Sequence, residues 1–197
     1  EVCFSLLETN EVIVTYSGVS SEDTLLNCTN HSYFNLSGNL KETIHNHTLK
    51  MNAPRYIPIN EHGLPLGMPL EVEDTVFDFT LAKPLSVVIG ATDKQVCLAS
   101  GGLDHSFLLD EGIIILTDSN SGRQLTIITQ EPAVVVYTGN KIGSGYFFKE
   151  VTAKNFLGIC LEEQNVPNSI KYPQYPSAFL AKDTPYSKTT TYKFEVI

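Results

Sequence analysis

Short runs of apolar and β-branched residues recur along the chain, separated by segments rich in Gly, Pro, Asn and Ser. Residues 12–16 are rich in β-branched side chains, and residues 133–137 form a continuous apolar run. Residues 189–196 alternate between polar and apolar or aromatic side chains. These patterns are typical of strands, and the continuous run favours a strand buried on both faces. No stretch of about ten residues or more has the periodicity of an amphipathic helix. The pattern therefore predicts an all-β sandwich or barrel.

A hairpin is predicted where residues 113–117 and 125–129 flank the turn-rich segment 118–123. Residues 2–7 and 157–161 predict further strands. Each of these runs is short, and turn residues bound it, as expected in a sheet protein.

Two long stretches, residues 53–79 and 167–185, each contain four prolines. Proline removes a ladder donor and fixes φ, so both stretches are predicted to be loops laid over a sheet. Loops on a rigid sheet are common places for binding and catalytic residues.

The composition limits the kinds of molecule that this chain is expected to bind. The length of 197 residues suits one large domain or a tight pair, and the hydrophobic content of 42% can supply a sizeable core. No linker or repeat divides the chain, so one domain over residues 1–197 is expected. A net charge of −9 repels phosphate backbones and anionic lipids, so neither nucleic acid nor a membrane is expected as a partner. The chain has no apolar run of about 20 residues and no signal-peptide pattern at its start. The four cysteines form no Cys-x-x-Cys pair, so buried, reduced thiols in a cytoplasmic protein are expected.

Residues 27–38 hold the first candidate for chemistry, His31, which lies between Asn30 and Ser32 and close to two aromatic residues. Histidine has an unperturbed pKa of about 6.5, which suits a proton donor near neutral pH. The alternative is a polar histidine at a strand end, with no role in chemistry.

Two further candidates are carboxylates. Asp104 follows a glycine pair, which allows a sharp turn that aims the carboxylate at a ligand; an Asx-turn before a strand is the alternative. Glu162 and Glu163 end an apolar strand. Side chains alternate along a strand, so one of the two should face a site, and an ordinary salt bridge at the rim is the alternative.

Metal and cofactor sites are not predicted. His45 and His47 would lie on one face of a strand, and His105 adjoins Asp104, but no third ligand is spaced to join the first pair. The chain has neither a glycine-rich phosphate loop nor a Gly-x-Ser-x-Gly elbow, so no cofactor is expected.

Three segments together resemble the aldose 1-epimerase (galactose mutarotase) family: residues 30–38, 101–107 and 161–167. Shorter matches occur at residues 53–58, 77–79, 121–123 and 137–140. The resemblance implies a large antiparallel β-sandwich that binds a free sugar in an open cleft. It also implies that the chain corresponds to the C-terminal portion of the family fold, without its N-terminal strands and the Arg and His they supply.

The resemblance assigns roles to the candidates. His31 falls on the general acid, Glu162 on the general base, and Asp104 on a residue that holds sugar hydroxyls. Glu163 stands where the family usually has a small hydroxyl residue, and Val135 where it often has a sugar-binding Gln. The implied reaction interconverts the α and β anomers of free galactose or glucose by acid-base ring opening and closure, without a cofactor.

A non-catalytic carbohydrate-binding or regulatory relative that keeps the sugar cleft is the alternative. The absent strands and Val135 favour it, whereas the joint presence of His31, Asp104 and Glu162 opposes it. A glycoside hydrolase fits poorly, because it would use two carboxylic acids rather than a histidine donor. A sugar-phosphate epimerase would need clustered Arg or Lys near the three segments, and none is found there.

Overall fold

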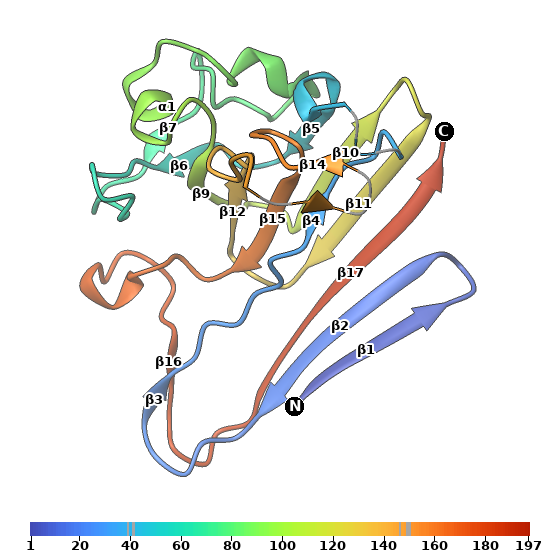
Figure 1. Ribbon diagram of the computed structural model, residues 1–197. Coiled ribbons are helices and arrows are strands. Elements are labelled where there is room, and N and C mark those ends of the chain that lie inside the picture. The colour runs from blue at the N-terminus through green and yellow to red at the C-terminus, as the bar shows by residue number, and fades with distance from the viewer. Residues whose placement is uncertain (39, 41, 146, 149–150) are drawn as a thin grey trace.

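The computed structural model of the chain describes residues 1–38, 40, 42–145, 147–148 and 151–197. Among these residues, antiparallel strands form a seven-stranded and a six-stranded sheet (Figure 1). The larger sheet has the order β1 (Val2–Leu7), β2 (Glu11–Gly18), β17 (Tyr186–Val196), β11 (Arg123–Thr129), β10 (Ile113–Asp118), β5 (Thr48–Met51), β8 (Lys83–Pro84). The smaller has the order β4 (Tyr33–Phe34), β15 (Ile159–Gln164), β12 (Ala133–Tyr137), β9 (Asp104–Leu108), β6 (Arg55–Ile57), β7 (Leu70–Glu71). The predicted all-β class is confirmed.

Little else in the described residues is regular. Two short ladders consist of β13 (Phe147–Phe148) with β14 (Val151–Thr152), and β16 (Phe179–Leu180) with β3 (Thr24–Leu25). The helical segments are α1 (Lys94–Leu98) and the 3₁₀ turns η1 (Ile44–Asn46), η2 (Leu85–Val87) and η3 (Ser169–Lys171). In this described part of the chain, no helix combines the length and apolar character needed to cross a membrane.

The main core lies between the two sheets. The larger sheet contributes Leu49, Leu116, Leu125 and Ile127, and the smaller contributes Phe107, Val134, Val136 and Leu161. All of these side chains are buried. Alternate residues of each strand point into this core, so the other face of each strand remains available for different side chains.

The predicted hairpin is confirmed, because β10 and β11 pair from Ile113 opposite Ile128 to Asp118 opposite Arg123. The apolar run at residues 133–137 is confirmed as a buried strand, since β12 lies between β9 and β15. A strand with neighbours on both edges and side chains covered on both faces has no polar periodicity to show.

The prediction of a plain loop over residues 53–79 is wrong at its start. Tyr56 and Ile57 in β6 are buried, and β6 pairs with both β9 and β7, so part of this stretch belongs to the smaller sheet. Its prolines lie outside β6, where no ladder donor is lost.

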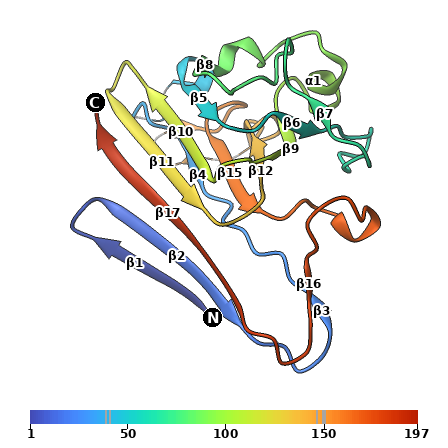
Figure 2. The ribbon, with the colours of Figure 1, turned by 180° about the vertical axis from the view of Figure 1, so that it is seen from behind.

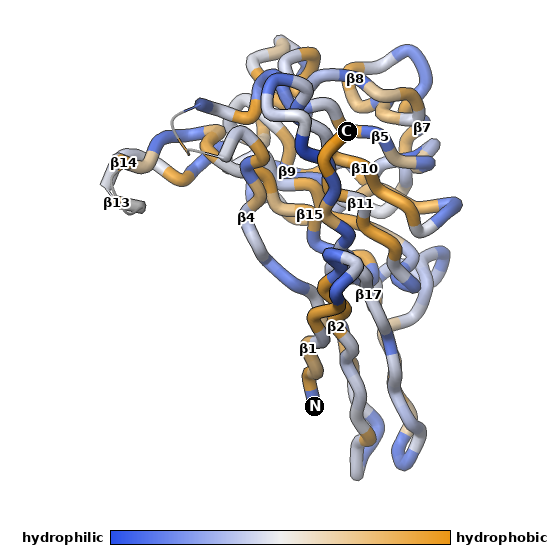
Figure 3. Tube along the Cα trace, turned by 90° about the vertical axis from the view of Figure 1, so that its right-hand side faces the viewer, coloured by the Kyte–Doolittle hydropathy of each residue, from blue (hydrophilic) through white to orange (hydrophobic). Residues whose placement is uncertain are grey.

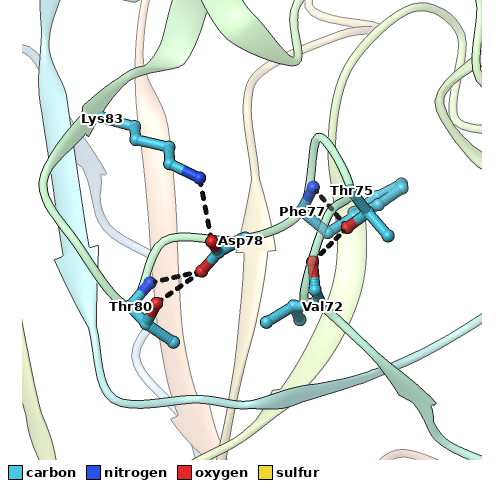
Figure 4. A network of polar contacts seen from close by, with 6 residues as sticks. All are labelled: Val72, Thr75, Phe77, Asp78, Thr80 and Lys83. Atoms are coloured by element: carbon cyan, nitrogen blue, oxygen red, sulfur yellow. Dashed lines mark hydrogen bonds and ion pairs between the residues drawn. The ribbon is translucent and has the colours of Figure 1, made fainter.

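A network of local hydrogen bonds holds the turns between residues 72 and 83 (Figure 4). Asp78 accepts hydrogen bonds from the backbone and hydroxyl of Thr80 and from the ammonium of Lys83. With the turn held in this way, Phe77 and Phe79 enter the main core, and Phe77 stacks on Tyr56 at a centroid distance of 4.2 Å.

The stretch over residues 167–185 is mostly loop, as predicted, apart from η3 and β16. Tyr175 packs with Ile57, Ala133 and Val166 in a second, smaller core. Its hydroxyl donates to the backbone carbonyls of residues 66 and 67, so the two proline-rich stretches are tied together.

The larger sheet extends beyond the smaller one. In Figures 1 and 2, β1 and β2 lie away from the strands of the smaller sheet. Phe4 lies opposite Val14 and Leu6 opposite Val12, so these side chains share the face that forms the main core elsewhere. Phe4 is 66% exposed and Leu6 79% exposed, and Figure 3 shows this apolar character along β1.

Candidate active site

Three central strands of the smaller sheet bring candidate side chains together on the face turned away from the main core. The register aligns two rows of residues across β9, β12 and β15. The first row consists of Asp104, Tyr137 and Cys160; the second consists of Ser106, Val135 and Glu162. Because a strand alternates its side chains, residues two apart on each strand face the same side. Two candidates, Asp104 and Glu162, therefore share one face of the sheet.

His31 reaches the same face from the segment that precedes β4. Its Nε2 lies 3.3 Å from Glu162 Oε1, and its side chain is 51% exposed. The imidazole also contacts two tyrosine rings, with centroid distances of 5.3 Å to Tyr33 and 6.3 Å to Tyr137. The fold thus brings His31 and Glu162 together, although the two residues lie far apart in the sequence.

Burial dominates the electrostatics of Glu162 and raises the pKa of its carboxyl group. The nearby His31 lowers this pKa, Asp104 raises it, and a hydrogen bond from Gln164 lowers it. A carboxylate that is partly desolvated accepts a proton more readily than one in water. Glu162 is therefore suited to take a proton from a ligand on this face.

A tight turn sets the position of Asp104, whose pKa is raised by burial and lowered by Lys141 and His31. Gly102 has no room for a Cβ, because the side-chain oxygens of Asn140 and Thr138 occupy that place. The amide of Asn140 donates to the carbonyls of residues 99 and 103, which closes the turn. The glycine pair and the segment 137–140, which are separate in the sequence, thus form one hydrogen-bonded turn.

Glu163 points to the opposite face, into the core. It is only 2% exposed, and its Oε2 accepts a hydrogen bond of 2.6 Å from the hydroxyl of Tyr192 in the larger sheet. Burial raises the pKa of Glu163 to about 7, and its Oε1 has no partner among the described residues. The alternative of a salt bridge at the rim is therefore wrong for Glu163.

The same tyrosine lies near the His31 segment: burial raises the pKa of Tyr192, whereas the Asn30 side chain lowers it. Asn30 Oδ1 accepts a hydrogen bond of 2.8 Å from the hydroxyl of Ser32. The residues on both sides of His31 are therefore hydrogen-bonded to each other.

The other histidines do not join this site. His45 lies in η1 rather than on a strand, and buried His47 accepts a hydrogen bond from the backbone of Leu36 through Nε2. The expectation of two imidazoles on one strand face is wrong for this pair. His105 is wholly buried against Tyr56 and Phe77, and burial lowers its pKa to about 4.

Sequence reasoning missed Cys160 as a site residue, although its spacing of two from Glu162 in a strand could have indicated a shared face. One ligand atom each from His31, Cys160 and Glu162 lies within 4.8 Å of the others. Burial raises the pKa of the Cys160 thiol to about 12, and the neighbouring Tyr33 hydroxyl lowers it. All four cysteines are free thiols, but only Cys160 is buried, so the expectation of four buried thiols is wrong.

A cavity of about 540 Å³ adjoins this group of residues. Tyr33 and Tyr137 form part of its wall, together with Lys141 and Leu157. Ligand pockets commonly have volumes of about 300–1,000 Å³ and apolar walls with a few polar groups. His31, Asp104 and Glu162 do not line this cavity; it is linked to them only through Tyr33 and Tyr137, whose rings also contact His31.

Comparisons with known proteins show which family this chain is similar to. Galactose mutarotase from Mus musculus is 35% identical over 196 residues, which cover 96% of this chain and 56% of that protein. Aldose 1-epimerase from Haemophilus influenzae is 34% identical over 179 residues, covering 88% of this chain and 52% of that protein. The crystal structure of galactose 1-epimerase from Lactobacillus acidophilus matches 99% of this chain and 56% of that one, with a TM-score of 0.86 and 29% identity.

These matches run over nearly all of this chain, which spans about half the length of the curated relatives that it matches. A family model described as aldose 1-epimerase matches residues 1–193. The chain therefore belongs to the aldose 1-epimerase family.

Proposed function

We propose that this chain carries aldose 1-epimerase activity and interconverts the α and β anomers of a free hexose such as galactose or glucose. The single observation that supports this most is the pairing of His31 with Glu162 at 3.3 Å, on the face of the smaller sheet that is turned away from the main core. An imidazole and a partly desolvated carboxylate in one site form an acid-base pair that can work near neutral pH.

The chemistry requires two proton transfers in each direction. Glu162 takes the proton of the C1 hydroxyl while His31 donates a proton to the ring oxygen, and the C1–O5 bond breaks to give the open-chain aldehyde. Rotation about the C1–C2 bond then presents the other face of the carbonyl. Closure reverses both transfers, so the residues return to their starting protonation states and no cofactor is consumed.

Other residues of the same face suit a sugar. Asp104 can accept hydrogen bonds from sugar hydroxyls, and charge-assisted hydrogen bonds of this kind are among the stronger ones. Tyr33 and Tyr137 present aromatic surface to the apolar C–H patches of a pyranose. Val135 lies between Ser106 and Glu162 in the register and adds no polar group there.

Polarimetry of freshly dissolved α-D-galactose tests the proposal. The 197-residue chain should speed equilibration beyond the uncatalysed rate, and Glu162→Gln or His31→Asn should each reduce this effect by about 10²–10⁴-fold, the usual contribution of a positioned acid or base. The matched control is the exposed pair Glu61 and His62, which also lie in contact, at 3.6 Å. Glu61→Gln and His62→Asn should leave the rate unchanged.

Saturable galactose binding without any acceleration would contradict the proposed activity and point to a non-catalytic sugar-binding protein. Repeating the assay with α-D-glucose compares the two proposed substrates.

We also assign the protein to the cytoplasm, where four unpaired thiols would remain reduced.

A further inference from the structure

We propose that His31, Cys160 and Glu162 form a binding site for a thiophilic divalent cation of the Zn²⁺ type, and that bound metal and sugar exclude each other. Imidazole nitrogen, thiolate sulfur and carboxylate oxygen are the three kinds of ligand that zinc accepts in proteins. The metal-binding part of the proposal stands on geometry alone, whereas the exclusion of sugar rests on the proposed function.

The backbone holds two of the three ligands in place. Cys160 and Glu162 lie two residues apart on β15, a strand that pairs with β12 along its length and with β4 at Cys160. Both side chains therefore project from one face of a strand that has neighbours on both sides. This is a fixed pair of ligands rather than a chance encounter of surface groups.

The third ligand is the one that can adjust. The three ligand atoms lie within 4.8 Å of one another, and the contact between His31 and Glu162 is already 3.3 Å. Zinc holds sulfur at about 2.3 Å and nitrogen or oxygen at about 2.0–2.2 Å, so the ligands must draw slightly closer around the ion. The half-exposed His31 side chain lies on a segment outside the strands and can make that movement.

The donor set selects among cations. Mg²⁺ and Ca²⁺ require mostly oxygen ligands, which this group does not supply. A thiolate favours Zn²⁺ and other soft or borderline ions, and three protein ligands leave one position open for water. On binding, the Cys160 thiol releases its proton to solvent, and the two anionic ligands balance the charge of the divalent ion.

The consequence for chemistry follows from shared atoms. Nε2 of His31 and a carboxylate oxygen of Glu162 are the atoms proposed to move protons in the sugar reaction. A metal ion that occupies their lone pairs leaves neither group able to take or give a proton. Bound metal would therefore inhibit the proposed activity, and bound sugar would protect the site from metal.

The binding is tested by isothermal titration calorimetry, in which zinc chloride is added to the 197-residue chain. The wild-type chain should bind zinc saturably at this site, and Cys160→Ser and His31→Asn should each weaken this binding. Loss of an outer-shell partner alone costs about 10- to 100-fold in metal affinity, so loss of a ligand should cost at least about tenfold. The matched control is Cys97→Ser, which removes an exposed thiol in α1 and should leave the affinity unchanged.

A second measurement covers the risk that Cys160→Ser, at a buried position, fails to fold. Cadmium chloride should produce the ultraviolet absorption of a metal–thiolate bond in wild type and in Cys97→Ser. In His31→Asn, whose altered side chain is half exposed, this band should need a higher cadmium concentration. Equal zinc and cadmium binding in wild type and in His31→Asn would overturn the proposal.

Saturating galactose should weaken zinc binding to the wild-type chain. If zinc binding depends on His31 and Cys160 but galactose has no effect on it, the metal site stands and the exclusion of sugar is overturned. If zinc binds independently of these residues while polarimetry shows the epimerase activity, the metal site is overturned and the proposed function stands.

Discussion

Glu162 and Glu163 are chemically identical neighbours that β15 sends to opposite environments. Glu162 lies on the face of the smaller sheet that is turned away from the main core, and it contacts His31. Glu163 lies in the core, where its partner is the hydroxyl of Tyr192. Burial raises the pKa of both carboxyls, and it raises the pKa of the more deeply buried Glu163 to about 7.

The pKa of Glu163 predicts a specific dependence of stability on pH. Because the folded state raises this pKa from 4.5 to about 7, the stabilising contribution is complete below 4.5 and is lost as the pH rises to about 7. At 1.36 kcal/mol per pKa unit, the loss amounts to about 3 kcal/mol. Urea unfolding at about pH 5 and about pH 8 should show this loss in wild type and a smaller one in Glu163→Gln.

The exposed Glu8→Gln is the matched control and should retain the wild-type difference between the two pH values. A Glu163→Gln variant with the full wild-type pH dependence would contradict the buried, protonated carboxyl.

Among the secondary-structure elements, contacts between segments explain why particular loop residues are needed to keep the turns in place. The turn before β9 depends on Gly102, whose missing side chain makes room for Asn140 and Thr138. The network around Asp78 likewise fastens a turn so that Phe77 and Phe79 reach the core (Figure 4). In both cases a polar loop residue positions the structure behind or beside the candidate site.

Gly102→Ala should destabilise the protein and weaken the proposed activity. The added methyl group collides with two buried polar side chains, and overpacking of this kind typically costs about 1–3 kcal/mol. Because Asp104 follows two residues later, the strain should also displace its carboxylate and raise KM for galactose. Thermal unfolding and polarimetry measure the two effects.

Gly18→Ala is the control, since a Cβ at Gly18 would meet nothing within 4 Å. Its stability should stay within about 0.5 kcal/mol of wild type, as is usual for a surface change away from special features. An equal effect of the two substitutions would contradict the close approach at Gly102.

Across the whole molecule, the strands differ in how well they are buried and paired. β12 has neighbours on both edges and is buried over most of its length. β1 lies at the edge of the larger sheet, and its side chains are exposed on the part that extends away from the smaller sheet (Figures 1 and 3). The ladder with β2 is the strand pairing that holds β1 in the sheet.

Amide hydrogen exchange should reflect this difference. The amides of β1 should exchange through local opening at low free energy, whereas those of β12 should exchange only when the whole structure unfolds. Mass spectrometry of peptides from residues 2–7 and 133–137 measures the two rates. Comparable protection of both strands would contradict the unequal packing.

Much of the fold follows from local pattern. Alternation and β-branched runs predicted β2, the hairpin of β10 and β11, and the buried strand β12, because the period of two is a property of a few consecutive residues. The sequence segments around His31, Asp104 and Glu162 also resembled one family, which the comparisons support. β6 was missed because three residues between prolines carry too little pattern to distinguish a strand from a loop.

The all-β class, the main strands and the residue types able to move protons can be read from the order of amino acids. The contact of His31 with Glu162, and the place of Cys160 beside them, follow instead from how the strands pair and the segments pack. The same holds for the burial of Glu163 against Tyr192. These contacts join segments far apart in the chain, and strand pairing and sheet packing create them, whereas local sequence patterns report only on near neighbours.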